Sequence, residues 1–319
     1  MKTFKFKLTK FLRLIEGMDW EYIIPYLFIQ YKYKTTIDKT IALRHINFAF
    51  IERKFDQLLN KYKDLHDDSH VNNGPVWVCW MQGEDSMPEI VQVCYRQLRK
   101  MLPANRKLIL ITWDNVRQYT DIPEYIYEKL QKGIITFTHF SDIIRFSVLS
   151  IHGGLWVDST VYVASQIPES TFNRPYFSVR TAYNAESELK YNGVNRCLWK
   201  CFILGAVSES IWFKCAKEMI YKYWENNDFL LAYMLVDYIL ISIYDCNGNV
   251  RQDVESGVEQ IDYLYSFEKL ANEPYNEDEF HKMTISNRWF KLSYKLPFKT
   301  HTSDGQITYY GKLINVKEE

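Results

Sequence analysis

The sequence predicts an α/β fold of the doubly wound type, and three observations lead to this prediction. Residues 76–80 and 108–111 are short apolar runs, rich in strand-forming residues, that are typical of buried strands. Between them, Met-Pro-Glu at 87–89 indicates the start of a helix, because proline favours the first helical turn. Farther along, a helical pattern that ends at Gly153 and Gly154 is followed by another apolar run. Strand, helix and strand in this order are the opening of a doubly wound sheet.

The composition is that of an ordinary globular protein, with 47% hydrophobic and 24% charged residues in a chain of 319. The formal net charge is zero, so no overall positive field attracts nucleic acid, and we expect no nucleic-acid partner. Six cysteines occur without a Cys-x-x-Cys pair, which argues against a zinc site and favours reduced thiols. Because we find no signal peptide and no apolar run of about 18 residues, we expect a cytoplasmic protein without a transmembrane helix.

Residues 1–72 are expected to form an N-terminal helical segment, followed by one large domain at 73–319. The first 15 residues carry several basic side chains and no acid, interleaved with aromatic and aliphatic residues. Such a basic amphipathic stretch can lie in the interface of an anionic membrane, which would make the protein peripheral on the cytoplasmic face. A solvated helix packed on the main domain explains the same pattern. A second helix is predicted at 36–62, and Asn-Gly-Pro at 73–75 marks the boundary.

Two aspartates outside the central motif are candidate site residues. Asp114 follows the strand predicted at 108–111, where it could hold a ribose or a base. A single aspartate at such a position is more often a helix cap, here of a short helix at 115–119. Asp237 lies in the most apolar helix of the chain, predicted at 230–244. A charge on such a helix belongs either to a buried pair or to a functional site, because an unpaired buried charge is costly.

The central motif of the chain combines a helix, a glycine pair and a strand between residues 139 and 163. Its first half carries apolar side chains at helical spacing, and Ser141 is expected to cap the helix. Gly153 and Gly154 end this helix, because glycine readily adopts the positive φ that a helix end requires. Residues 155–157 then predict a buried strand, which ends at Asp158.

Three charged side chains of this motif are expected to meet. Asp142 and Arg145 lie three residues apart, so they project from one helical face. Asp158 lies at the end of a buried strand, where open α/β sheets place ligand-binding groups. An acid and a base on the helix, together with an acid at the strand end, could hold a polar, anionic molecule. The plainer explanation is an exposed Asp142–Arg145 ion pair of small energetic value, but the order of the elements favours a site.

The motif resembles the core signature of the capsular polysaccharide synthesis glycosyltransferases. In the wider group, which includes glycosyltransferase family 32 and the glucosylating domains of large clostridial toxins, the signature reads Ser-Asp-x-x-Arg, Gly-Gly and Asp-x-Asp. Here His-Phe-Ser-Asp-x-x-Arg at 139–145 is followed by Gly-Gly-Leu-Trp-Val-Asp-Ser-Thr at 153–160. Thr160 replaces the second Asp, as is common in the capsular branch. The resemblance implies a GT-A-like, Rossmann-type nucleotide-sugar-binding fold in which helices flank a mixed sheet.

The same resemblance implies a nucleotide-sugar site. In the toxin relatives a tryptophan at the end of the first strand stacks on the base, which assigns Trp80 to the base with Gln82 nearby. Arg145 would supply fixed positive charge to the donor, and Asp142 would accept hydrogen bonds from sugar hydroxyls. The residues expected to contact the nucleotide sugar are Trp80, Gln82, Asp114, His139, Asp142, Arg145 and Asp158.

A divalent cation, Mn²⁺ or Mg²⁺, is expected to neutralise the leaving diphosphate and to be weakly bound. Asp158 would supply the carboxylate ligand, Thr160 a hydroxyl, and His301 in the C-terminal tail a further contact. Asp237 is assigned to the site because the capsular family also shows an Asp in a Tyr- and Phe-rich helix, where it could position the acceptor. The expected catalytic residues are Asp142, Arg145, Asp158 and Asp237.

The function that these features imply is a glycosyltransferase. It would move a sugar from a nucleotide-sugar donor, UDP-linked, to a lipid-linked oligosaccharide or a growing capsular polysaccharide, with retention of anomeric configuration. Two alternatives stay open at this point. One is a non-catalytic carbohydrate-binding or assembly subunit that keeps the fold, and the other is a sugar-phosphate transferase of the same pathway.

Overall fold

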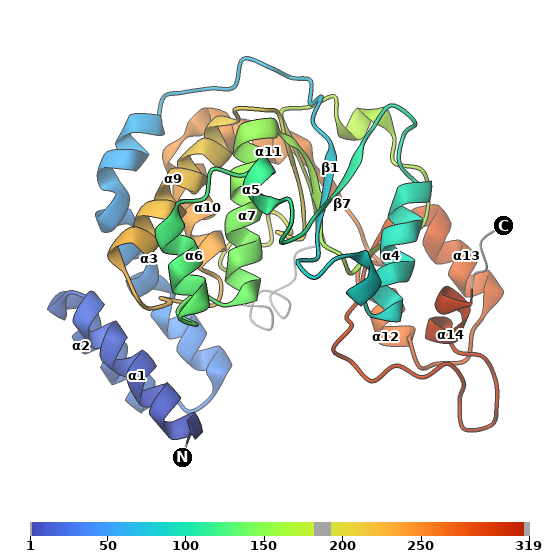
Figure 1. Cartoon of the computed structure of the whole chain (residues 1–319), viewed down its shortest axis with the longest axis horizontal. Helices are drawn as coiled ribbons and strands as arrows, with labels where there is room; N and C mark the ends of the chain where they lie inside the picture. The colour runs from blue at the N-terminus through green and yellow to red at the C-terminus, as the bar shows by residue number, and fades with distance from the viewer. Residues whose placement is uncertain (1, 182–192, 316–319) are drawn as a thin grey trace.

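The computed structural model describes residues 2–181 and 193–315, and for residues 2–8, 10, 36, 37 and 40 it describes the backbone alone. The described part contains a six-stranded mixed sheet flanked by helices and a second, two-stranded sheet (Figure 1). The α/β class and the mixed sheet expected from the sequence are therefore confirmed.

The strand order of the large sheet is β2-β1-β3-β6-β5-β7, and that of the small sheet is β4-β8. The bounds of the strands are β1 Val76–Cys79, β2 Leu108–Ile111, β3 Gly154–Val157, β4 Val161–Val163, β5 Tyr176–Arg180, β6 Ile203–Ala206, β7 Val258–Gln260 and β8 Trp289–Lys291. Strand β1 pairs in parallel with β2 and with β3, whereas β6 runs antiparallel to both of its neighbours. The carboxyl ends of β1, β2 and β3 therefore lie at the same edge of the sheet.

The described helices surround both sheets. Their bounds are α1 Lys2–Gly17, α2 Trp20–Lys32, α3 Thr36–Tyr62, α4 Glu89–Lys100, α5 Val116–Tyr119, α6 Glu124–Gln131, α7 Phe137–His152, α9 Ile211–Asn226, α10 Leu235–Cys246, α11 Gly248–Gly257, α12 Ser266–Leu270, α13 Glu277–Ser286 and α14 Tyr309–Ile314. Two short 3-10 turns are Glu84–Ser86 and Glu169–Thr171. Helices α7, α9, α10 and α3 lie on one side of the molecule, and α4, α12, α13 and α14 lie on the other (Figure 1).

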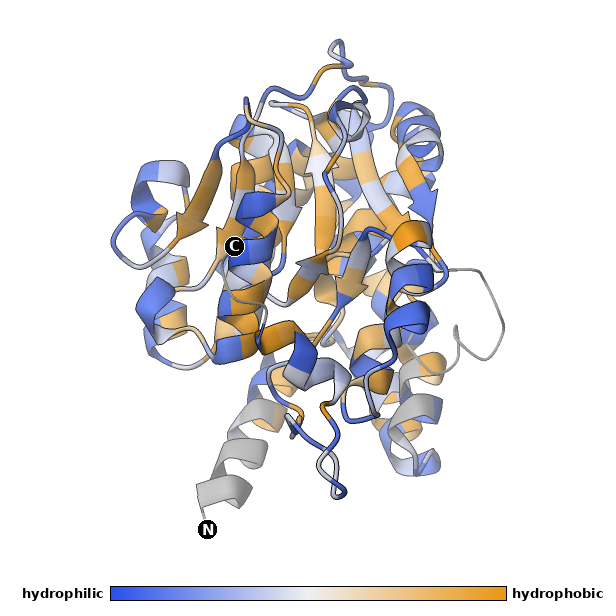
Figure 2. Cartoon of the chain, turned by 90° about the vertical axis from the view of Figure 1, so that its right-hand side faces the viewer, coloured by the Kyte–Doolittle hydropathy of each residue, from blue (hydrophilic) through white to orange (hydrophobic). Residues whose placement is uncertain are grey.

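The two faces of the sheet belong to two separate hydrophobic cores. Successive side chains of a strand point to opposite faces, so alternate residues of β1 enter different cores. Val76 and Val78 pack in the core that includes α4, whereas Trp77 packs in the larger core that includes α7. Figure 2 shows the hydrophobic strands enclosed by helices whose outer faces are hydrophilic.

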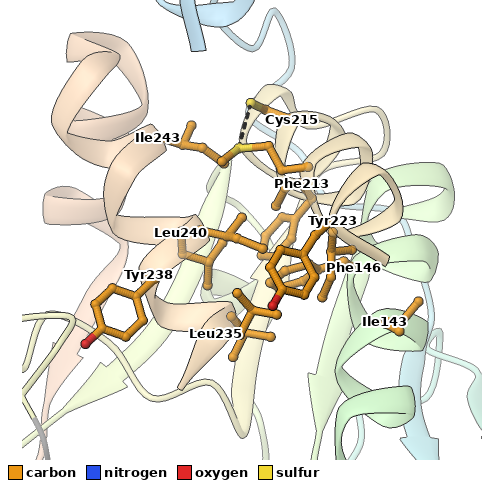
Figure 3. Packing of buried hydrophobic residues seen from close by; sticks show 14 of the residues in the cluster. Ile143, Phe146, Phe213, Cys215, Tyr223, Leu235, Tyr238, Leu240 and Ile243 are labelled. Carbon is orange, nitrogen blue, oxygen red and sulfur yellow. Dashed lines mark hydrogen bonds between the residues drawn. The ribbon is translucent and has the colours of Figure 1, made fainter. Parts of the chain in front are cut away.

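In the larger core, helix α9 packs against both α7 and α10. Figure 3 shows Phe146 of α7 beside Phe213 of α9, with ring centroids 6.0 Å apart, and these two side chains, Ile143 of α7 and Leu240 of α10 are fully buried. Helix α3 packs on the outside of α9 and α10. This packing fixes α7, and with it the helical half of the central motif.

The N-terminal helices form the outer layer on that side. Tyr22 and Ile23 of α2 are buried in the larger core, and α2 packs against α3. Two ion pairs join the same helices, Asp19 with Lys54 at 3.4 Å and Glu21 with Arg53. The division at residue 72 stays a prediction. Among the described residues, no helix combines the length and the apolar character needed to cross a bilayer.

Helix α7 begins earlier than the sequence pattern indicated. Thr136 is its N-cap, and the Thr136 hydroxyl accepts a hydrogen bond from the backbone N–H of His139 at 3.4 Å. The prediction that Ser141 caps this helix was wrong, because Ser141 lies within it and its hydroxyl donates to the Thr138 carbonyl. Helix α10 begins at Leu235, five residues after the predicted start at 230.

The glycine pair ends α7 as expected. Gly153 has φ +63° and Gly154 has φ +98°, both in the region that favours glycine. A Cβ at Gly154 would lie 2.1 Å from the Pro75 carbonyl oxygen, so the close approach of β1 and β3 also requires glycine there. The chain can therefore pass directly from α7 into the buried strand β3.

Candidate functional site

Three strand ends meet at one edge of the large sheet. Trp80 follows β1, Asp114 follows β2, and Asp158 follows β3. Because these strands run in parallel, their carboxyl ends lie together, which is where open α/β sheets bind ligands. Asp158 begins a tight turn in which its carbonyl accepts from Val161 N–H at 2.9 Å, so the chain turns at once into β4.

The three charged residues of the central motif are in contact. Arg145 Nη1 donates to Asp142 Oδ1 at 2.6 Å, and Arg145 Nη2 donates to Asp158 Oδ1 at 3.1 Å. The guanidinium lies 4.8 Å from the ring centroid of Trp156, whose indole N–H also donates to Asp158 Oδ1 at 2.8 Å. One turn of α7 thus places a buried arginine between two carboxylates.

A lysine that the sequence did not single out completes the arrangement. Strand β8 pairs antiparallel with β4, and this pairing sets Lys291 opposite Val161. The Lys291 ammonium donates to Asp158 Oδ2 at 3.2 Å and to Thr160 Oγ1 at 2.6 Å. We refer to Asp142, Arg145, Asp158, Thr160 and Lys291 as the Asp158 cluster.

The electrostatics of the cluster keep Asp158 ionised. Burial alone would raise the pKa of Asp158, but the positive charges of Lys291 and Arg145 outweigh it, and the pKa lies below its usual value. Burial raises the pKa of Asp142, although Arg145 beside it acts in the opposite direction. Burial would lower the pKa of Arg145, but Asp142 and Asp158 raise it further, so the guanidinium stays charged.

A cavity of about 770 Å³ opens beside the cluster. Four of the residues predicted for the site line it, namely Trp80, Gln82, Asp158 and Thr160. Six predicted residues are not among its lining residues, namely Asp114, His139, Asp142, Arg145, Asp237 and His301. Lys291 lines the cavity with Lys295, Glu268 and several aromatic side chains, so its wall is both charged and aromatic.

Trp80 is held in place at one wall of this cavity. Its indole N–H donates to Ser86 Oγ at 2.9 Å, and its ring meets the ring of Tyr294 edge to face at 5.4 Å between centroids. Trp77, by contrast, is 1% exposed, and its indole N–H donates to the Gly153 carbonyl at 2.8 Å. Of the two tryptophans on β1 and its end, only Trp80 can therefore contact a ligand in the cavity.

Asp142 and Arg145 lie behind Asp158 with respect to the cavity. The Arg145 side chain is 4% exposed, whereas the Asp158 side chain is 29% exposed. Arg145 can thus hold Asp158 in place without contacting the contents of the cavity. Their predicted direct contacts with a sugar nucleotide stay predictions.

Neither His139 nor Asp114 lines the cavity: His139 is buried and Asp114 is exposed. His139 is buried, its Nδ1 lies 2.8 Å from Thr136 Oγ1, and its Nε2 lies 3.2 Å from the Tyr233 carbonyl oxygen. Asp114 is exposed in the short connection between β2 and α5. The N-cap of α5 is Asn115, so Asp114 is not the cap of that helix.

Asp237 forms a second buried centre, which we call the Asp237 cluster together with Asn195, Trp199 and Cys201. Its Oδ1 accepts from Asn195 Nδ2 at 2.9 Å, from Trp199 Nε1 at 3.0 Å and from the Cys201 thiol at 3.2 Å. Its Oδ2 is buried without a hydrogen-bond partner among the described residues. Burial raises the pKa of Asp237, and these hydrogen bonds only partly oppose that shift.

The side chains predicted to bind a divalent cation already have partners in the structure. Both carboxylate oxygens of Asp158 accept hydrogen bonds, and the Thr160 hydroxyl accepts from Lys291. His301 is exposed and its Nδ1 lies 3.1 Å from Thr300 Oγ1. Within residues 2–181 and 193–315, no group of three or more His, Cys, Asp or Glu side chains is arranged to hold a metal ion. The donors therefore do not fit a divalent cation while Lys291 keeps this position.

One comparison, with models of known protein families, agrees with the resemblance drawn from the central motif. The family model described as capsular polysaccharide synthesis protein matches residues 29–313. This match includes the large sheet, the Asp158 cluster and the cavity, but it leaves out α1 and most of α2. No curated protein and no solved structure matches the chain.

Proposed function

Because the chain belongs to the capsular polysaccharide synthesis protein family, we propose that it is a glycosyltransferase of the GT-A type that acts in capsule synthesis. The donor is a nucleotide sugar, UDP-linked, and the acceptor is a lipid-linked oligosaccharide or a growing polysaccharide at the cytoplasmic face of the membrane. The mixed sheet supports this proposal, since its three parallel strands end at the site.

The observation that carries the proposal is the Asp158 cluster at the wall of the cavity. Transfer of a sugar leaves a nucleoside diphosphate, whose developing negative charge must be neutralised. Preorganised cations in a partly desolvated cavity stabilise such charge more strongly than water does. Lys291 lines the cavity, so one fixed positive charge faces the place where a diphosphate would lie, and Arg145 adds a second positive charge from just behind Asp158.

The proposal gives roles to several residues that line the cavity and to two that lie behind Asp158. Trp80 stacks on the base and Gln82 contacts it, because both line the same wall. Asp158 fixes Lys291 and contacts the sugar, and the buried pair of Arg145 and Asp142 positions Asp158. The aromatic residues Tyr233, Tyr265 and Tyr294 complete a lining that suits the apolar faces of sugar rings.

Retention of configuration is part of the proposal, as the family resemblance implies. A double displacement would need a carboxylate nucleophile at the reacting carbon. Asp237 is not among the residues that line the cavity, so it does not have that position in the described structure. Proton NMR of the product's anomeric centre tests this part of the proposal, since an inverted product contradicts it.

The proposed function as a whole is tested with a panel of nucleotide sugars. Thermal shift measures their binding, and an assay of donor hydrolysis measures their turnover. A true donor raises the melting temperature by mass action and is hydrolysed slowly to a nucleoside diphosphate. Binding without turnover in the presence of acceptor lipid would instead favour an assembly subunit. Release of a nucleoside monophosphate would favour a sugar-phosphate transferase, and no shift with any nucleotide sugar would contradict the proposal.

A further inference from the structure

Lys291 occupies the position that the sequence pattern assigns to a divalent cation. Its ammonium lies 3.2 Å from Asp158 Oδ2 and 2.6 Å from Thr160 Oγ1, the two residues that flank Ser159 in the Asp-Ser-Thr motif. It also lies 4.9 Å from the ring centroid of Phe202. The Lys291 side chain is 20% exposed, so its charge faces the cavity from a fixed, mostly buried position.

We propose that Lys291 takes the place of the metal, so that this enzyme neutralises the donor diphosphate with a built-in ammonium and works without a divalent cation. This inference rests on the proposed glycosyltransferase function. Lys291 forms no covalent bond and keeps its protons throughout. It donates hydrogen bonds to the diphosphate while Asp158 and Thr160 hold its ammonium in place.

The charges of the motif support the replacement of the metal by a lysine. An Asp-x-Asp motif offers two carboxylates, which suit a doubly charged cation. Here Thr160 removes one negative charge and Lys291 adds one positive charge, so the pair of Asp158 and Lys291 is already neutral. A divalent cation on Asp158 would lie within a few Å of the ammonium, and like charges at that distance repel strongly in a partly buried site.

The test uses nucleotide binding, and not enzyme activity, as its readout. The full chain is titrated with UDP by calorimetry, once in EDTA and once with excess Mn²⁺. We expect the two dissociation constants to agree within about twofold. In EDTA, Lys291→Met weakens UDP binding by about tenfold or more, because a charge-assisted hydrogen bond to phosphate is lost. Lys291→Arg keeps part of the affinity, and the exposed Lys282→Met serves as the matched control.

The outcomes separate this inference from the function on which it rests. If UDP binds the wild-type chain only when Mn²⁺ is present, the lysine proposal is overturned and the glycosyltransferase proposal stands. If Lys291→Met is folded by circular dichroism and binds UDP in EDTA like the wild type, the lysine proposal is overturned as well. If no nucleoside diphosphate binds under either condition, the proposed function itself fails.

A second feature, independent of the site, is an exposed aromatic stripe on α2. Trp20, Ile24, Phe28 and Tyr31 follow one another at helical spacing, and their side chains are between 60% and 90% exposed. We call these four residues the α2 stripe. On α1, Phe11 and Leu12 are also more than 40% exposed. Figure 1 shows α1 and α2 together at the outer edge of the helical layer, away from α4.

The charges beside the α2 stripe are predominantly basic. The acids Asp19 and Glu21 form ion pairs with Lys54 and Arg53 of α3. Lys32 and Lys34 at the end of α2 are exposed. In sequence, residues 1–15 add five basic residues and no acid, although the side chains of most of them lie outside the described residues.

We infer that the α2 stripe inserts into the interface of an anionic membrane. Tryptophan and tyrosine favour the level of the lipid headgroups, and neighbouring lysines attract anionic lipid. Three of the four residues of the α2 stripe lie outside the part matched by the family model, and Tyr31 lies within it. The α2 stripe would hold the cavity close to a lipid-linked acceptor.

Vesicle sedimentation of the full chain tests this inference. We expect binding to phosphatidylglycerol vesicles, weak binding to phosphatidylcholine vesicles, and loss of binding in high salt. Trp20→Ser with Phe28→Ser lowers the partition coefficient by about tenfold or more, whereas Ile285→Ser, an equally exposed site on α13, leaves it unchanged. Equal partitioning of all three forms overturns the inference, as does a concentration-dependent dimer that the double variant abolishes.

Discussion

Two aspartates in this protein, one at a cavity wall and one fully buried, have opposite surroundings. Asp158 accepts hydrogen bonds from two cations, Arg145 and Lys291, and it lines a cavity. Asp237 is 1% exposed, accepts from three neutral donors, and is not among the cavity's lining residues. The first has its pKa lowered by its neighbours, and the second has its pKa raised by burial.

The difference separates a residue suited to ligand chemistry from one suited to holding the fold. A carboxylate kept ionised by cations at a cavity wall can exchange those contacts with an incoming phosphate or sugar. A carboxyl group whose neighbours are an indole, an amide and a thiol joins α10 to residues 195–201. On these contacts we expect Asp158 to affect turnover and Asp237 to affect stability.

The largest effect is expected for Asp158→Asn. The variant removes the negative charge that positions Lys291 and Arg145, so transfer and donor hydrolysis should fall by about 10²–10³-fold, the usual cost of losing a preorganised electrostatic contact. Initial rates with the best donor of the panel give this number. Asp278→Asn on the exposed surface of α13 is the matched control and should keep full activity. Unchanged turnover in a folded Asp158→Asn protein would remove Asp158 from the mechanism.

A stability change, with little change in turnover, is expected for Asp237→Ala. The variant leaves the buried indole N–H of Trp199 without its acceptor and removes one of the two acceptors of Asn195 Nδ2, which costs about 1–3 kcal/mol in the free energy of unfolding. Urea denaturation measures this cost, and the rate per folded molecule measures activity. If Asp237→Ala instead loses activity at unchanged stability, then Asp237 acts at the acceptor, as the sequence resemblance implied.

A smaller effect is expected in the pH dependence of the free energy of unfolding, which reports whether Asp237 is ionised in the native protein. Because burial raises its folded-state pKa above the usual 3.8, the native protein holds a proton that the unfolded chain has released. The bound proton stabilises the native state fully below the usual pKa of 3.8, and this stabilisation is lost as pH rises through the folded-state pKa. Asp237→Asn lacks the titration, so its stability relative to wild type should increase with pH over that window.

Urea denaturation of both proteins at pH values from 4 to 8 checks this prediction. Asp142, Cys201, Lys200, Tyr176 and Tyr238 are titratable groups that interact with Asp237, and all of them are retained in the variant. A stability difference that stays flat across the range would show that Asp237 is ionised normally in the native protein.

Much of the fold and part of the site could be predicted from local sequence patterns. The strand ends, the glycine pair and the spacing of Asp142 and Arg145 are local features, and each depends on residues within one or two turns. These features were enough to predict that Asp142, Arg145 and Asp158 meet, and the structure shows the three in contact. The helix start was missed because Thr136 lies before the apolar pattern, in a turn where periodicity gives no signal.

Lys291 could not be predicted in the same way. It lies 133 residues after Asp158, on a strand of three residues whose partner β4 is equally short. No periodic pattern links two such strands, because their pairing is set by tertiary packing. The one local signal is a lysine within the otherwise apolar run at 289–292, where a charge requires a partner.

The most direct test of the account is photolabelling with 5-azido-UDP, followed by mass spectrometry of the labelled peptides. The account predicts that label appears on the segments that hold Trp80 to Ser86 or Ser293 to Lys295, that excess UDP prevents it, and that Asp158→Asn reduces it. Label confined to peptides away from this cavity, or label that excess UDP does not reduce, would contradict it.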